Sequence, residues 1–517
     1  MTSGRRILLP LFLVIALGCA FRLVALDRIP GINGDEAWFG VNVQQRVAHR
    51  AAFERTPSGL PLDPFHTIPL EFVTRVAPPS FWALRFPAAF WNVLALLLAY
   101  PLLAAPLGRV AALLATLFIA VSPAAIAYSR ISWEPSETVF FSLLILAFAA
   151  RGWLEAALFT FACSLLAHPT NIFLFPVLLG AFAGAASARS KWIGPAAILA
   201  FAGVAAAALY LGKFVLDQES DVARGITLAH PSEIWVRAVD PELWWATIRG
   251  VVRLLTGITT GRSIAGAVPS GIERGIEVAG FLLVGFRVAI AFLFLPDESK
   301  RSFVGLTLGF LVSIAAFHLF AGPRAIGTPH ERYALVFVVP ACILIAVPVE
   351  GIRHTHWRIA ALVTTSWIAL SIFSFVAGYA VPLFRDGGNA HVTYRTGKVE
   401  PKKAAFVFIG SELQPGETAA LSADSWWIYW PLRYLTAPVS DRIQVEPARF
   451  QHPPVAPPGA APPSLSQTTS RGFAIAFADS SPLQISEGRQ MFVASDPRDR
   501  PILRVFELER RTGERAP

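Results

Sequence analysis

Two adjacent carboxylates, Asp35 and Glu36, stand in the stretch GINGDEAWFG, directly after the first apolar run of the chain. A carboxylate can act as a general base when it is held beside the hydroxyl that loses the proton. In the simplest alternative, Asp35 caps a helix that begins at Glu36. A cap requires only one acid and leaves Glu36 unexplained, so both interpretations stay open at this point.

Cationic side chains lie at the ends of later apolar runs, and they are Arg130, His168, His330 and Arg332. Arginine suits phosphate because its guanidinium donates two parallel hydrogen bonds. Each arginine alone could be an interfacial side chain, Arg130 could pair with Glu134 on one helix turn, and His330 could be an ordinary loop histidine. Their concentration, above all in the stretch PHERY, favours an anion-binding site.

Other reaction classes find little support in the residue spacing. Asp35, Glu36, His168 and His330 could supply ligands to a divalent metal, but they match no metal motif. The chain has no P-loop, no dinucleotide-binding fingerprint and no legible Ser-His-Asp or Cys-His system. A metal is therefore left open, and nucleotide-dependent chemistry is not indicated.

The elements that position these residues belong to a membrane protein. Of 517 residues, 54% are hydrophobic and 15% are charged, which is more apolar surface than a soluble chain of this size can bury. The net charge of +9 arises from Lys and Arg that flank the apolar runs, and no nucleic-acid motif is present. The 3 cysteines lie inside apolar runs and form no disulfide pattern.

A helix needs about 20 apolar residues to cross the hydrocarbon, and this criterion predicts an α-helical polytopic membrane protein with about 11 transmembrane helices. The predicted spans are 7–26, 84–104, 110–128, 134–150, 152–167, 170–188, 192–214, 276–295, 303–321, 332–349 and 357–382. The fourth and fifth are short and could form a re-entrant pair instead, which would leave the orientation of the later spans unchanged.

Lys and Arg gather in alternate connections, which predicts a cytoplasmic N-terminus. The other connections, predicted to be extracytoplasmic, are 27–83, 129–134, 168–171, 215–275, 322–333 and the C-terminal tail. These connections contain the acids and cations named above. We therefore expect one polar extracytoplasmic surface with a cleft as the site.

Two of these connections are predicted to contain helices that lie on the membrane. Residues 242–255 place Trp244 and Val251 on one face and Arg249 on the other, and residues 36–52 show the same pattern more weakly. Either segment could be an ordinary packing helix.

The composition changes to that of a soluble domain near residue 385, which divides the chain into 1–384 and 385–517. A helix is expected at 401–413, followed by strands at TAALSA, RIQVE, GFAIAFA and ILRVFELE, with a Pro-rich loop at 453–463. The stretch WWIYW could stack on a sugar, although a helix packed on the sheet or the membrane surface is the commoner use of such a stretch. The second unit is predicted to be a small extracytoplasmic α/β domain.

An extracytoplasmic site has little access to ATP or nucleotide sugars, and its reagents are normally carried by lipids. A transferase with a lipid-phosphate donor requires a base for the acceptor hydroxyl, cations for the departing phosphate and a groove open to the bilayer. The acids and cations described above meet the first two requirements.

At these residues the sequence resembles the GT-C-type glycosyltransferases related to protein O-mannosyltransferases and the lipid A aminoarabinose transferase. The motifs that carry the resemblance are, in order, GDEAWFG, HTIPLEF, LRFPAAFWNVLALLLAYPLLAAPLGR, SPAAIAYSRISWEPSETVF and HERYALVFVVP. The resemblance implies a GT-C-like catalytic domain over 1–384. It also implies transfer of a sugar from a polyprenyl-phosphate donor to an acceptor glycan, lipid or protein on the outer face.

By motif position, Asp35 matches the catalytic acid of the family's first external loop, with Glu36 beside it. The residues implied to bind the donor phosphate are Arg85, His330, Arg332 and Tyr333, and those expected to support them are His66, Arg130, Glu134 and His168. His66 marks a departure, because the aminoarabinose enzymes carry a lysine before the proline of the second motif. Their substrate is therefore not implied.

On this hypothesis Asp35 is the base, Glu36 orients the acceptor or a metal, and the arginines stabilise the departing phosphate in a single inverting displacement. The alternatives are a transporter of lipid-linked glycans, an oligosaccharide polymerase or ligase, and a non-catalytic assembly subunit. The polymerase, ligase and assembly-subunit alternatives do not require Asp35. A bacterial inner membrane is the expected location, because the chain is compact and its external loops lack cysteine pairs.

Overall fold

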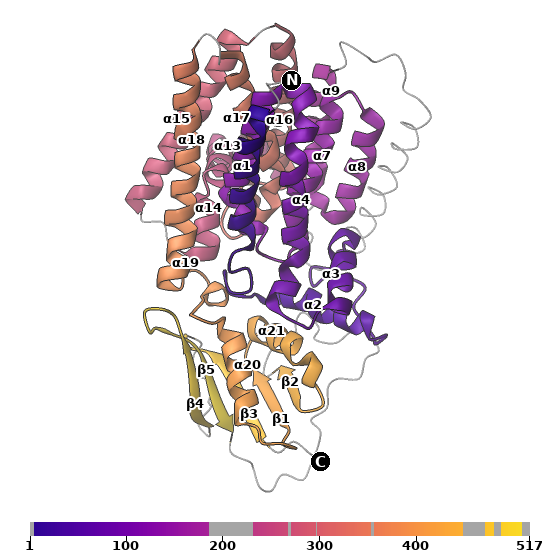
Figure 1. Ribbon diagram of the computed structural model, residues 1–517, viewed down its shortest axis with the longest axis vertical. Coiled ribbons are helices and arrows are strands. Elements are labelled where there is room, and N and C mark those ends of the chain that lie inside the picture. Colours follow the sequence, from indigo (N-terminus) through magenta and orange to yellow (C-terminus); the bar gives the residue numbers. More distant parts are fainter. Residues whose placement is uncertain are drawn as a thin grey trace.

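The computed structural model describes residues 5–185, 231–266, 270–295, 297–352, 356–447, 471–479 and 488–508. These residues form a long helical bundle with a β-sheet region at one end, remote from the beginning of α1 (Figure 1). The predicted span at 192–214 and the predicted loop at 453–463 lie outside the described residues.

Most of the remaining predicted spans contain a single long helix. Those helices are α1 (Arg5–Leu23), α4 (Phe81–Leu107), α5 (Arg109–Val121), α7 (Thr138–Ala150), α8 (Leu154–Ala167), α9 (Phe175–Ala185), α15 (Ser270–Phe294), α16 (Asp297–Phe320), α17 (Val338–Ile352) and α18 (Trp357–Phe375). Among the described residues, 5 helical segments are long and apolar enough to cross a membrane. The helical class and the C-terminal sheet are confirmed, while the count of about 11 spans stays a prediction.

Several predicted spans begin or end in short turns at the sheet-bearing end of the bundle. The span predicted at 110–128 breaks at Pro123, which starts the separate helix α6 (Pro123–Tyr128) after a Ser122 cap. The spans predicted at 134–150, 170–188 and 332–349 open with 3₁₀ turns, which are η1 (Glu134–Glu137), η2 (Pro169–Leu174) and η5 (Glu331–Phe337). The polar motifs therefore lie on tight turns joined to the ends of rigid helices.

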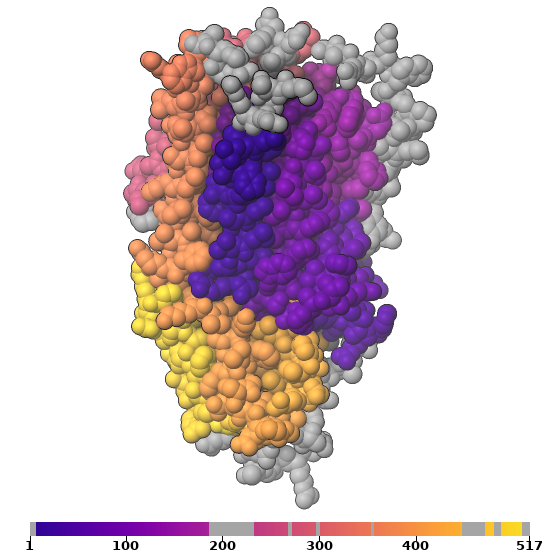
Figure 2. Space-filling model, viewed as in Figure 1, coloured from indigo at the N-terminus to yellow at the C-terminus, as the bar shows by residue number. Residues whose placement is uncertain are grey.

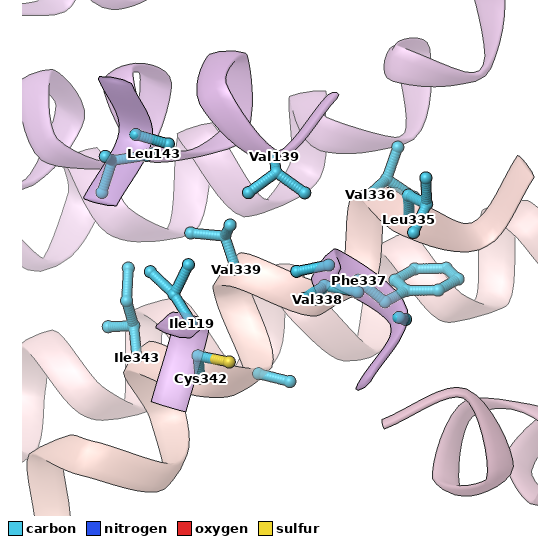
Figure 3. Close-up of a cluster of buried hydrophobic side chains, with 14 of the residues drawn as sticks. Ile119, Val139, Leu143, Leu335, Val336, Phe337, Val338, Val339, Cys342 and Ile343 are labelled. Atoms are coloured by element: carbon cyan, nitrogen blue, oxygen red, sulfur yellow. The ribbon is translucent and has the colours of Figure 1, made fainter. Parts of the chain in front are cut away.

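Helix α17 and the η5 turn before it occupy the centre of the bundle. The most apolar stretch of Glu331–Ile352 is 83% buried, whereas the corresponding share in the other long spans is 33–39%. In Figure 3, Ile119 of α5 and Val139 and Leu143 of α7 lie around the chain from Leu335 to Ile343. Burial of this side-chain cluster stabilises the segment that carries the PHERY motif.

Several shorter helices lie in the connections between the long helices, and three of them bear on the site. They are α2 (Gly34–Val47), α3 (Pro64–Val76) and α13 (Pro241–Leu255). Both expected connection helices are present, although α2 ends before residue 52. The arginines of α13 are ion-paired with α15, as in the 2.9 Å contact between Arg253 and Glu277, and α13 is fastened to the bundle on that side.

The C-terminal region is an α/β structure, as predicted. Helix α20 (Pro401–Glu412) and helix α21 (Trp426–Thr436) accompany a sheet of β1 (Ala419–Ala423), β2 (Ile443–Pro447), β3 (Arg471–Phe477), β4 (Gly488–Ser495) and β5 (Pro501–Leu508). The strand order is β2-β1-β3-β5-β4, with β1 parallel to β2 and β3, and β5 antiparallel to β3 and β4. Strand β4 was not predicted. The region and the bundle share one continuous surface (Figure 2), and the division at residue 385 stays a prediction.

Candidate functional site

The connections predicted to share one face do meet at the sheet-bearing end of the bundle. The Tyr128 hydroxyl donates a hydrogen bond of 2.6 Å to Glu331, which joins the end of α6 to η5. The His168 ring stacks on Tyr333 at 5.5 Å, which joins η2 to the same turn. This end of the molecule is therefore assembled from segments far apart in the sequence, and its extracytoplasmic position stays a prediction.

The first turn of α2 separates the two adjacent acids. Asn33, not Asp35, is the N-cap: its side-chain oxygen accepts a hydrogen bond of 2.9 Å from the Glu36 amide, and Glu36 in return accepts one of 3.2 Å from the Asn33 amide. This reciprocal pair is a capping box. The expectation that Asp35 caps the helix is wrong, and the acid with the capping role is Glu36.

Glu36 is fully buried and saturated by protein donors. Arg85 donates to both of its carboxylate oxygens, at 2.8 and 2.9 Å, and the Ser132 amide donates at 2.9 Å. Such a desolvated acid with a bidentate arginine is a structural ion pair. In this structure Glu36 has no access to an acceptor or a metal, which corrects the role given to it from the sequence.

Arg85 is likewise unavailable to a donor phosphate. Its side chain is 0% exposed. Every N–H of its guanidinium is used, because the groups that do not bind Glu36 donate to the carbonyl oxygens of Leu26, Pro30 and Gly31. Arg85 therefore fixes the turn before α2, and its expected phosphate-binding role is wrong for this arrangement.

Arg130 also has a structural position. It donates to the carbonyl oxygens of Phe21, Val24, Ala25 and Ile29, which satisfies the open C-terminal end of α1. The alternative pairing of Arg130 with Glu134 is not formed. An arginine that caps a helix in this way has little capacity left for a ligand.

His66 lies in the interior between α3 and η1. Its Nδ1 is 3.0 Å from Glu137 and its Nε2 is 3.1 Å from the Ser132 hydroxyl. Because that hydroxyl donates its hydrogen to the Leu84 carbonyl, Nε2 must be the donor to Ser132. Burial lowers the pKa of His66. The side chain supports the Ser132 segment that holds Glu36, and it does not face a ligand.

Asp35 has a different environment from Glu36. It is partly exposed, and its Oδ1 accepts a hydrogen bond of 3.0 Å from the indole N–H of Trp426 in the C-terminal region. Burial raises the pKa of Asp35, the charge of Arg332 and the Trp426 hydrogen bond oppose that rise, and the charge of Glu36 adds to it. An acid whose pKa is raised while a nearby cation favours ionisation suits a general base.

Arg332 is the partly exposed cation of the site. Its guanidinium lies over the rings of Trp133 at 4.6 Å and Tyr333 at 4.7 Å, and it donates to the Pro329 carbonyl and the Tyr333 hydroxyl. These contacts fix the plane of the guanidinium and leave N–H groups without a partner among the described residues. Unlike Arg85, Arg332 can bind an anion.

The two histidines of the site are neutral. Burial and the charge of Arg332 lower the pKa of His168 to about 3 and also lower the pKa of His330. Both rings stack on Tyr333. Since the Thr170 amide donates to Nδ1 of His168, its proton is on Nε2, which can donate a hydrogen bond. Both histidines lie close enough to Arg332 to feel its charge, and their lowered pKa values mean that they add no positive charge to the site.

Glu134 and Tyr394 complete the described surroundings of Asp35. Glu134 is half-buried at the start of η1, and its pKa is raised to about 7, mainly by burial. Tyr394 belongs to η7 (Val392–Tyr394), which follows the last span, and burial and nearby acids raise its pKa. Sequence reasoning missed Tyr394 and Trp426, because both come from segments that reach Asp35 only in the folded chain.

The expected metal ligands are not brought together. Within the described residues, no three His, Cys, Asp or Glu side chains are grouped so that they could hold a metal ion. Glu36 is already saturated by Arg85, Ser132 and Asn33. The site as described is an acid–arginine site.

Comparison with solved structures identifies the fold. ArnT from Cupriavidus metallidurans in the apo state matches with a TM-score of 0.54 and 12% sequence identity, over 96% of this chain and 97% of that chain. ArnT bound to undecaprenyl phosphate matches with a TM-score of 0.41 and 13% identity, over 98% of both chains. The archaeal oligosaccharyltransferase AglB from Archaeoglobus fulgidus, in complex with an inhibitory peptide and a dolichol-phosphate, matches with a TM-score of 0.45 and 14% identity, over 86% of this chain and 64% of that chain.

No protein-family model matches the chain, and no curated protein matches it by sequence. ArnT is a GT-C glycosyltransferase, so its match over nearly the whole chain confirms the GT-C-like fold expected from the sequence. At this level of identity the match concerns the fold, and the chemistry has to be argued from the site.

Proposed function

We propose that this chain is a membrane glycosyltransferase that moves a sugar from a polyprenyl-phosphate donor to an acceptor hydroxyl. The observation that carries the proposal is that the charge of Arg332 acts on Asp35 at one end of a GT-C-like bundle. Both are partly exposed, whereas Glu36 and Arg85 beside them are fully engaged with each other. The arrangement leaves one acid and one arginine able to reach substrates.

The reaction is a single displacement in which the acceptor hydroxyl attacks the anomeric carbon of the donor sugar. The bond from that carbon to the phosphate oxygen breaks, and the electron pair leaves with the polyprenyl phosphate. Asp35 takes the proton of the hydroxyl, and Arg332, with Tyr333 and the two neutral histidines, stabilises the phosphate charge. A single displacement inverts the anomeric configuration.

An apolar cavity supports a lipid-linked donor. The cavity has a volume of about 550 Å³ and lies among α13, α15, α16 and α17, where Trp244, Phe281, Phe310 and Leu344 are among its lining residues. Leu344 is on the helix that continues from Arg332 through η5. In this proposal the phosphate of the donor is bound at Arg332, and the cavity receives part of its hydrocarbon chain.

The test compares lipid extracts from cells with the gene deleted, restored, or restored as Asp35→Asn at matched membrane expression. Mass spectrometry should find one polyprenyl-phosphate sugar that accumulates in the deletion and the Asp35→Asn strains but not with the intact gene. Its mass identifies the donor sugar. A normal lipid profile in the Asp35→Asn strain would refute the role of Asp35 and favour a polymerase or an assembly subunit.

A further inference from the structure

The stretch GINGDEAWFG packs closely against residues 393–434 in the C-terminal region of the same chain. A Cβ atom added to Gly31 would lie 2.6 Å from the carbonyl oxygens of Thr393 and Arg395, and one added to Gly40 would lie 2.6 Å from the Tyr434 ring. Real Cβ atoms essentially never come this close to other heavy atoms, so a larger residue at these positions would push the neighbouring segment away. The turn that carries Asp35 is shaped to receive a segment from the other end of the chain.

Gly34 makes the closest of these approaches, and its partner is Trp426. A Cβ at Gly34 would lie 2.5 Å from Cδ1 and 2.8 Å from Nε1 of that indole. The edge of the indole that carries its N–H therefore lies against the first turn of α2, one residue from Asp35. In this position its N–H reaches Asp35 Oδ1 at 3.0 Å.

The indole is held from behind by other aromatic rings. Trp426 is 9% exposed and meets Trp430 edge to face at 5.3 Å, and Trp430 in turn meets Trp38 of α2 at 6.5 Å. Side chains locked by such packing present their polar atoms in a fixed direction. The donor to Asp35 is therefore preorganised by the contact between α21 and α2.

We propose that Trp426 is a positioning residue for the catalytic carboxylate: its indole N–H holds Asp35 Oδ1, so that Oδ2 faces the acceptor hydroxyl. Oδ2 has no hydrogen-bond partner among the described residues, which leaves it free for this role. The inference rests on the proposed function of Asp35. It makes the C-terminal region a part of the active site and not only a neighbour of it.

Two tryptophan variants separate positioning from packing. Trp426→Phe keeps an aromatic ring and removes the N–H, whereas Trp430→Phe removes an indole N–H that has no hydrogen-bond partner in the described part of the chain. We expect Trp426→Phe to lower kcat about 10–100-fold with little change in the KM for the donor, since one preorganised hydrogen bond is lost. Trp430→Phe should lose some thermal stability and keep the wild-type kcat within about 3-fold.

The pH profile gives a readout that packing alone does not change. The Trp426 hydrogen bond lowers the pKa of Asp35, so its removal raises that pKa. Asp35 must be ionised to act as a base, and therefore the acidic limb of kcat/KM should move to higher pH in Trp426→Phe but not in Trp430→Phe. The donor for this assay is the polyprenyl-phosphate sugar purified from the deletion strain, and the acceptor is that strain's envelope.

Gly34→Ala provides a second route to the same result, because the added methyl group displaces the indole without removing it. The acidic limb of kcat/KM should shift to higher pH in Gly34→Ala as it does in Trp426→Phe. If the Trp426→Phe protein does not accumulate in the membrane, Gly34→Ala tests the positioning role of Trp426 in its place. The inference is overturned if these variants have the wild-type pH profile while Asp35→Asn is inactive. If Asp35→Asn is itself fully active, the proposed function fails first.

Discussion

Asp35 and Glu36 are neighbours in the chain, but the structure assigns them to two different layers. The inner layer contains Glu36, Arg85 and Arg130, whose donors and acceptors are used within the protein. The outer layer contains Asp35 and Arg332, which keep polar atoms unoccupied and stay partly exposed. The same residue types therefore stabilise the fold in one layer and are available to substrates in the other.

The comparison shows how neighbouring residues of the same types can be given different environments by the fold. A buried ion pair with full hydrogen bonding is rigid, and it fixes the turn on which the open acid stands. Removing a partner from the inner layer should damage the fold. Removing one from the outer layer should damage the reaction and leave the fold intact.

The largest effect on the reaction is expected from Asp35→Asn. Loss of a general base lowers kcat by about 10²–10⁴-fold, because the amide cannot accept the hydroxyl proton. The measurement is single-turnover transfer from the donor purified from the deletion strain. The thermal unfolding midpoint should stay near that of the wild type, and a large drop in the midpoint would instead place Asp35 in the inner layer.

Glu36→Gln should mainly lower the stability of the fold, whereas Asp35→Asn should mainly lower the rate of the reaction. Glu36→Gln leaves the buried Arg85 charge without its partner, which costs about 3–5 kcal/mol of unfolding free energy. Thermal unfolding of detergent-purified protein and membrane expression level measure this loss. The double variant Glu36→Met with Arg85→Met should recover only part of it, because no buried charge stays unpaired but the carbonyl oxygens of Leu26, Pro30 and Gly31 lose their donor. A stable Glu36→Gln protein with low activity would contradict the structural role.

Arg332→Ala should lower kcat/KM for the donor about 100-fold, since one charge-assisted contact to the departing phosphate is lost. Arg332→Lys should recover only part of the loss, because lysine lacks the planar fork. Arg324 is a matched control, since it is an exposed arginine in the same connection. Equal losses for Arg324→Ala and Arg332→Ala would indicate a general charge effect of that connection.

The smallest effect concerns Glu134, which has a raised pKa of about 7 in the folded protein. The ordinary pKa of Glu134 in the unfolded chain is 4.5. The folded state therefore loses stability as the pH rises from 4.5 to about 7, and above pH 7 this loss of unfolding free energy is complete. Glu134→Gln should therefore raise the unfolding midpoint by about 1–3 °C at pH 8 and leave it unchanged near pH 4.5. A lower midpoint at pH 8 would mean that Glu134 is paired like Glu36.

Much of the fold could be predicted from the sequence, because membrane helices are recognised by the length and hydrophobicity of their apolar runs. The starts of the spans were less predictable, because Pro123, Pro135 and Pro169 open short helices or 3₁₀ turns where hydropathy shows one continuous run. Strand β4 was missed because GRQMFVAS lacks a regular alternation of apolar and polar residues.

The site was readable in part. The sequence singled out Asp35 and Arg332, and the structure leaves both of them partly exposed. The capping role was considered for Asp35, although Asn33 and Glu36 already have the spacing of the capping box that the structure shows. Nothing local marks Arg85 and Arg130 as buried, because burial depends on which segments fold over them. The contact of Trp426 with Asp35 joins residues 391 positions apart, and no sequence pattern at that separation predicts it.

That separation also has a consequence for synthesis. At a translation rate of about 5–20 residues per second, Asp35 leaves the ribosome roughly 20–80 s before Trp426 is made. During this interval the turn before α2 has no indole to lie against Gly34. On the proposed function, a chain that stops before α21 lacks the indole that holds Asp35, and we expect it to transfer sugar more slowly than the full chain.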